Sequence, residues 1–218
     1  MKSILTRLSF SALLLLLVSG LALAGTPVEK PFAKLSNKEL VKLHWKCLNE
    51  TEDVEKASDI QDEIVNRKAI KETVELLRKR GTGSIFGGWY YDMFQNLRSP
   101  ETDKLLKPLA NRKHDDLNYF ANKYFAEVGE KFALENLNAN YRESGSSREW
   151  AETVMFFGTF KYYPAKKNLV DSIDVADLSL AGASVESLML LYPETREKVK
   201  GLGIHDTVKF YKEYIKTH

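Results

Sequence analysis

The segment from Lys166 to Glu194 constrains the fold most strongly, because it contains two apolar stripes at helical spacing. Leu169, Val170 and Ile173 share one face of a first predicted helix. A second helix is predicted to begin after an N-cap at Asp177. Its stripe consists of Leu178, Ala181, Val185, Leu188 and Leu191. Two amphipathic helices in about 30 residues cannot bury their faces without neighbours, so the segment predicts a repeat protein.

Similar junctions recur along the rest of the chain at intervals of about 30 residues, a period typical of solenoids. They are Ser99-Pro100-Glu101, Val128-Gly129-Glu130, Tyr163-Pro164-Ala165 and Tyr192-Pro193-Glu194. These junctions predict six helix pairs, at 37–69, 70–101, 102–130, 131–165, 166–194 and 195–218. No strand-like alternation is sustained, so we expect an all-α protein.

The second helices of the third and fifth units share a residue pattern. In the fifth unit its residues are Asp177, Leu180, Gly182-Ala183-Ser184, Leu188 and Leu191. In the third unit they are Leu117, Ala121, Phe125, Val128 and Gly129. With about 30 residues per unit, this pattern resembles the HEAT-repeat family in its short form. The resemblance implies a right-handed α-solenoid of stacked antiparallel helix pairs. It implies protein or peptide binding only by analogy, since a fold does not fix a function.

The N-terminus has the pattern of a secretory signal peptide over residues 1–24. Lys2 and Arg7 form its basic region, an apolar run follows, and Ala22-Leu23-Ala24 fits a signal peptidase site. We therefore predict an exported protein, periplasmic in a bacterium and otherwise secreted. The expected organisation is a signal peptide at 1–24, an extended leader at 25–36 and a single helical repeat domain at 37–218.

The charge balance of the mature chain argues against nucleic-acid binding. Lys2 and Arg7 account for the whole excess of 32 Lys and Arg over 30 Asp and Glu. A near-neutral mature protein lacks the basic surface that phosphate backbones require. After the signal peptide, no segment has the roughly 20 apolar residues that would favour stable insertion into a membrane.

Polar motifs offer little support for catalysis or metal binding. His44 and Cys47 share a helix face, but no third ligand lies nearby in the sequence, so we interpret them as structural. His114-Asp115-Asp116 and His205-Asp206 stand where helices should begin, and we interpret them as capping residues. We accordingly expect a non-enzymatic protein with no cofactor and no metal.

Clustered aromatic residues are the better indication of a binding surface. Adjacent helical residues diverge by about 100°, so Trp89, Tyr90 and Tyr91 cannot all face one core. Exposed Trp and Tyr are enriched at protein interfaces. The candidate binding residues are Trp89, Tyr90, Tyr91, Trp150, Tyr162 and Tyr163.

Three functional hypotheses follow from the sequence. The first is an exported helical-repeat protein that binds a protein or peptide, as an adaptor or as an inhibitor such as a periplasmic immunity protein. The second is a small-ligand-binding protein or enzyme with a pocket between repeats. The third is a structural component of an envelope assembly.

Overall fold

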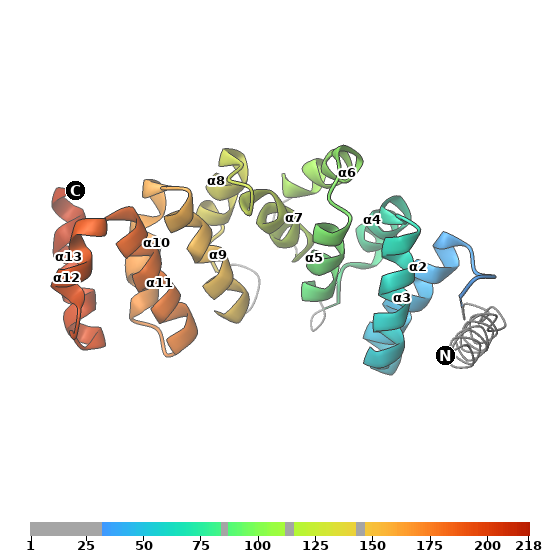
Figure 1. Ribbon diagram of the computed structural model, residues 1–218, viewed down its shortest axis with the longest axis horizontal. Coiled ribbons are helices and arrows are strands. Elements are labelled where there is room, and N and C mark those ends of the chain that lie inside the picture. Colours follow the sequence, from blue (N-terminus) through green and yellow to red (C-terminus); the bar gives the residue numbers. More distant parts are fainter. Residues whose placement is uncertain (1–31, 84–86, 112–115, 143–146) are drawn as a thin grey trace, which may run out of the picture. The chain divides into compact units, whose positions relative to one another are not determined.

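The computed structural model describes residues 32–83, 87–111, 116–142 and 147–218. Within these ranges the chain folds into twelve α-helices and contains no β-strand (Figure 1), which confirms the all-α prediction. None of the helices described there has the length and apolar character needed to cross a bilayer. The predicted signal peptide and most of the predicted leader lie outside the described residues.

Each predicted pair contains two observed α-helices, which we call its first and second helix. The first helices are α2 (Asn37–Lys46), α4 (Ile70–Arg80), α6 (Pro100–Ala110), α8 (Lys131–Ala139), α10 (Lys166–Ile173) and α12 (Arg196–Val199). The second helices are α3 (Val54–Asn66), α5 (Gly87–Asn96), α7 (Asp116–Ala126), α9 (Ser147–Thr159), α11 (Leu178–Leu191) and α13 (Ile204–Thr217). Short turns of other helix types are η1 (Cys47–Thr51), η2 (Tyr163–Ala165) and η3 (Pro193–Thr195).

Capping side chains fix the starts of α2 and α11, and the cap of α11 is the one that the sequence predicts. Before α2, the Ser36 amide donates to Glu39 Oε2 at 2.9 Å, and the Glu39 amide donates to Ser36 Oγ at 3.3 Å. Before α11, Asp177 Oδ1 accepts from the amides of Ser179 and Leu180 at 2.9 and 3.0 Å. These bonds satisfy amide donors that have no partner inside the helix.

Second helices pack on second helices from α3 to α11, and first helices pack on first helices from α2 to α6. Helix α4 contacts α2 and α6, while α7 contacts α5 and α9, and α9 also contacts α11. At the α9–α11 crossing, a Cβ added to Gly158 would lie 2.7 Å from the carbonyl oxygen of Ser187. Ser187 Oγ also donates to the Val154 carbonyl at 2.8 Å. This close approach therefore depends on a glycine at position 158.

Helix α7 is buried on every side, because α5, α6, α8 and α9 all contact it. Every residue from Leu117 to Ala126 is buried. Its asparagines supply hydrogen-bond donors to the last carbonyl group of α6. The side-chain amides of Asn118 and Asn122 donate to the Ala110 carbonyl at 2.8 and 3.0 Å. Asn136 of α8 donates to the same carbonyl at 3.0 Å and to Asn122 Oδ1 at 3.1 Å. These buried polar groups therefore serve as caps for α6.

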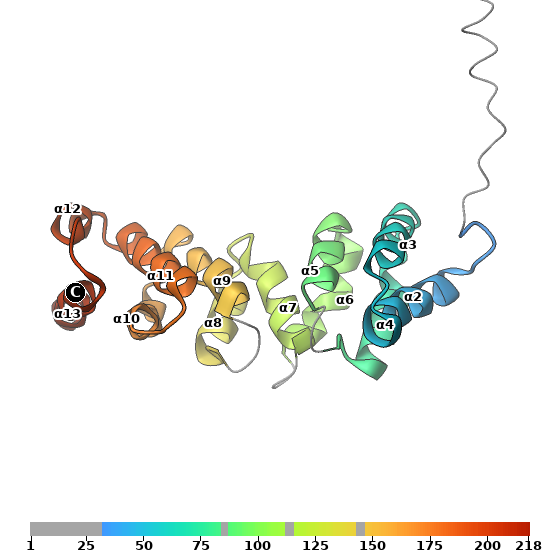
Figure 2. The same cartoon turned by 90° about the horizontal axis from the view of Figure 1, so that it is seen from below.

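The last pair departs from this packing pattern. Helix α12 has only four residues, and α13 packs mainly on the first helix α10. Figure 2 shows α12 on the side of α11 and α13 on the side of α10. The row of second helices is therefore continued beyond α11 only by the 3₁₀ turn η3 and the short α12.

Candidate functional site

An open apolar groove lies between α11 and the last helix pair. We call it the α11 groove, and its volume is about 360 Å³. Its lining is apolar apart from one threonine and consists of Ile173, Leu178, Ala181, Gly182, Val185, Val199, Leu202, Ile204 and Thr207. The groove exists because α12 is too short to cover the face of α11 that points away from α9.

Large apolar side chains are exposed in this groove. Leu178 is 77% exposed, Leu202 41% and Ile204 40%. Leu178, Gly182 and Val185 follow one another at helical spacing, so they form a continuous strip along two turns of α11. An exposed apolar strip of this kind is typical of an interaction surface.

The sequence predicts that Leu178 belongs to a packed apolar stripe, and only part of that prediction is right. Ala181, Leu188 and Leu191 are buried, whereas Leu178 is exposed and Val185 is half-buried. Among the small residues of this stretch, Ala181 and Ser184 are buried, but Gly182 has no atom within 4 Å of an added Cβ. The apolar stripe was visible in the sequence, whereas the shortness of α12, which uncovers it, was not.

The two walls of the groove differ in charge. From Asp174 to Tyr192 the sequence contains Asp174, Asp177 and Glu186 but neither Lys nor Arg. The α12 wall carries charges of both signs, and its exposed residues Lys200 and Glu197 form an ion pair with Lys200 Nζ 3.7 Å from Glu197 Oε2. The α11 wall is therefore the acidic side of the groove.

The aromatic segment Trp89–Tyr91 lies on α5 and is mostly packed. Tyr90 is fully buried, whereas Trp89 and Tyr91 are half-buried. The Tyr90 and Trp89 rings lie 5.5 and 6.5 Å from the ring of His44. Lys123 Nζ lies 4.2 Å from the centre of the Tyr91 ring and donates a hydrogen bond to Glu152 Oε2 at 2.6 Å. Tyr90 is therefore a core residue, and only Trp89 and Tyr91 keep exposed surface.

The second predicted aromatic group divides in the same way. Trp150 is 1% exposed and packs against Tyr119 and Tyr141, with ring centroids 5.3 and 4.8 Å away. Tyr162 is half-buried beside Phe157, whereas Tyr163 is 47% exposed. Trp150 therefore offers no surface to a partner, and Tyr163 is the most exposed of the six candidates. None of the six lines the α11 groove.

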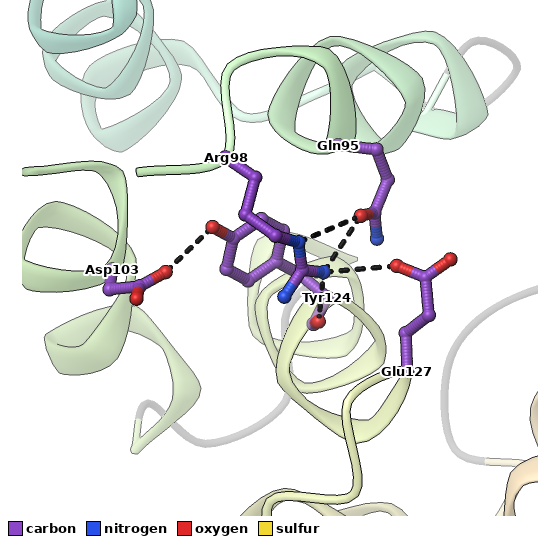
Figure 3. Close-up of polar contacts among 5 residues, drawn as sticks. All are labelled: Gln95, Arg98, Asp103, Tyr124 and Glu127. Atoms are coloured by element: carbon purple, nitrogen blue, oxygen red, sulfur yellow. Dashed lines mark hydrogen bonds and ion pairs between the residues drawn. The ribbon is translucent and has the colours of Figure 1, made fainter. Parts of the chain in front are cut away.

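A polar cluster around Arg98 joins α5, α6 and α7 (Figure 3). The Arg98 guanidinium donates to Gln95 Oε1, to the Tyr124 carbonyl and to Glu127 Oε2, at 2.7, 2.7 and 2.9 Å. It also lies 3.9 Å from the centre of the Tyr124 ring, whose hydroxyl donates to Asp103 at 2.6 Å. Burial, together with the bond to Asp103, raises the pKa of Tyr124. These mutual contacts connect the second helix pair to the third.

The histidine and the cysteine of the first helix pair lie inside the fold. His44 and Cys47 are buried, burial lowers the pKa of His44 to about 4, and burial raises the pKa of Cys47. No group of three His, Cys, Asp or Glu that could hold a metal occurs among the described residues.

The capping interpretation of His205-Asp206 is wrong, because the extended Gly203 precedes α13 and no side chain caps it. Asp206 lies in the first turn instead, where its negative charge favours the helix dipole. His114 and Asp115 of the other motif lie outside the described residues.

No protein-family model, no curated protein and no solved structure matches the chain.

Proposed function

We propose that this chain is an exported, non-enzymatic helical-repeat protein that binds a protein or peptide partner through the α11 groove. In this proposal its helix pairs stack as a right-handed, HEAT-like solenoid, and export places it in the periplasm or outside the cell. An adaptor or an inhibitor of the immunity type would use such a surface.

The observation that carries the proposal is the concentration of exposed apolar side chains in one concave place. Of seven large apolar residues that are exposed among the described residues, Leu178, Leu202 and Ile204 line the same groove. The other four are Val54, Val128, Phe160 and Tyr163, which lie outside it. Removing apolar surface from water contributes roughly 25 cal/mol per Å², so a partner that covers this groove gains affinity from contacts already in place.

The volume of the groove also fits a second candidate, a small apolar ligand. Ligand pockets usually occupy about 300–1,000 Å³ and combine an apolar lining with a few converging polar groups. Thr207 is the only polar side chain in the groove lining. We therefore favour a macromolecular partner, and the small ligand is the alternative. An envelope assembly remains the third hypothesis, in which the partner is a structural one.

A display selection tests the proposed function. Random peptides and small domains are selected on the purified protein and then measured on a Leu178→Asp variant. The matched control is Val54→Asp, because both residues are exposed and each is the first residue of a helix that follows an Asp N-cap. Loss of binding in Leu178→Asp but not in Val54→Asp supports the groove. Selected binders that ignore both substitutions would contradict it.

A further inference from the structure

We propose that the occupant of the α11 groove is an amphipathic α-helix of a partner protein, with Lys or Arg residues flanking its apolar stripe on the side that faces α11. This inference rests on the proposed function and specifies the partner for the same site.

The packing of the second helices favours a helical occupant. Helices α5, α7 and α9 each contact a second helix on both sides, and α11 contacts α9 on one side only. Beyond α11, the position of the next helix in the row is filled only by four-residue α12 and the turn η3. The strip formed by Leu178, Gly182 and Val185 has the spacing with which one helix packs against another. At Gly182 nothing lies within 4 Å of an added Cβ, so a side chain of the partner has room to enter.

Two carboxylates that adjoin lining residues of the groove favour a basic flank on the partner. Asp174 follows the lining residue Ile173 at the end of α10, and Glu186 follows the lining residue Val185 on α11. Both residues are exposed, and neither has an ion-pair partner among the described residues. Because the α11 wall contains no Lys or Arg, a helix with Lys or Arg on that side finds complementary charge, whereas one with Glu meets repulsion.

Two synthetic helical peptides test the inference. They share one leucine stripe and differ only in the flanking positions, which are Lys in one peptide and Glu in the other. Fluorescence anisotropy measures the affinity of each at low and at physiological ionic strength. We expect the Lys peptide to bind about tenfold more tightly, since two exposed ion pairs each contribute modestly, and we expect salt to reduce the difference.

Charge-reversal variants locate the effect. Asp174→Lys combined with Glu186→Lys should reverse the preference between the peptides. Asp59→Lys combined with Asp62→Lys changes the net charge equally at exposed positions of α3 and should leave the preference as it was. If the α3 variant reverses the preference as well, the attraction is non-specific and the inference fails.

The remaining outcomes separate the two proposals. Equal affinities, or tighter binding of the Glu peptide, would overturn the charge assignment. If neither peptide binds while display yields binders that depend on Leu178, the helical occupant is wrong and the proposed function stands. If display yields no such binder, the proposed function itself fails. A concentration-dependent dimer in sedimentation that Leu178→Asp abolishes would make the occupant a second copy of this chain, and would also overturn the inference.

Discussion

Helices α7 and α11 are both second helices of their pairs, yet their environments are opposite. All residues of α7 from Leu117 to Ala126 are buried, including Asn118, Asn122 and Lys123. Helix α11 is the more apolar of the two in sequence but leaves Leu178 77% exposed. The polar residues of α7 cap α6 and pair with neighbours, whereas the apolar residues at the start of α11 line an open groove.

This contrast shows that neighbours, more than the residue pattern, determine what is buried in a repeat protein. Helix α7 has contacting helices on all sides, so its polar residues must find partners inside the fold. Helix α11 is followed by a helix of four residues, so apolar residues that would be core elsewhere become surface. Exposed apolar groups in such a place are therefore better candidates for function than the buried aromatics.

The largest expected effect separates the two ends of α11 itself. Leu188 is fully buried, so Leu188→Ala should lower the free energy of unfolding by about 2–5 kcal/mol. Leu178→Ala should change it by less than about 0.5 kcal/mol, because the side chain is already in water. Urea denaturation of both variants at one pH measures this. Equal losses would mean that Leu178 is a packed residue and that the groove is closed in solution.

The pH dependence of stability tests His44, a buried polar side chain of α2 that packs against Tyr90 of α5. Neither ring nitrogen makes a well-formed hydrogen bond, and the nearby Gln61 side chain offsets only part of the effect of burial on the pKa. Burial lowers the pKa of His44 from 6.5 to about 4, so the unfolded chain binds the proton first as the pH falls. Its contribution to stability is present above pH 6.5 and is lost between pH 6.5 and about 4. The loss should reach about 3 kcal/mol.

Denaturation midpoints measured across this pH range, for the wild type and for His44→Gln, isolate the effect. The variant does not titrate at this position, so its curve should be flatter by the predicted amount whatever its stability at neutral pH. Parallel curves for the two proteins would show that His44 reaches water in the folded state.

Two helical glycines give the smallest and most closely matched comparison. Gly158→Ala places a methyl group 2.7 Å from the Ser187 carbonyl oxygen, and should cost about 1–3 kcal/mol by forcing α9 and α11 apart. Gly182→Ala meets no atom within 4 Å and should stabilise the protein by about 0.5–1 kcal/mol through helix propensity. Thermal denaturation distinguishes the two signs. Destabilisation by Gly182→Ala would indicate that the groove is occupied by the protein's own atoms.

The sequence predicted the helices well because their stripes, caps and proline junctions are local features. Asp177, for example, caps the helix that was expected to follow it. The groove was missed because it depends on the length of α12 and on the packing of α13 against α10, which no local pattern records.

The same limitation explains why Tyr90 and Trp150, which are buried, were included among the candidate binding residues. Trp150 is enclosed by Tyr119 and Tyr141, which lie 31 and 9 positions away in the sequence and meet it only in the fold. Periodicity identifies which residues share a helix face, but not which faces meet another helix.

The most direct test of the central claim is to map where the Lys-flanked peptide binds. Amide chemical shifts of the labelled protein are recorded during titration with this peptide. We expect chemical-shift changes that concentrate on residues 173–207, around Leu178, Gly182 and Ile204, and that disappear in Leu178→Asp. Shifts centred on Trp89, Tyr91 and Lys123 instead would contradict it, because they would place binding on the α5–α7 surface and leave the α11 groove without a role.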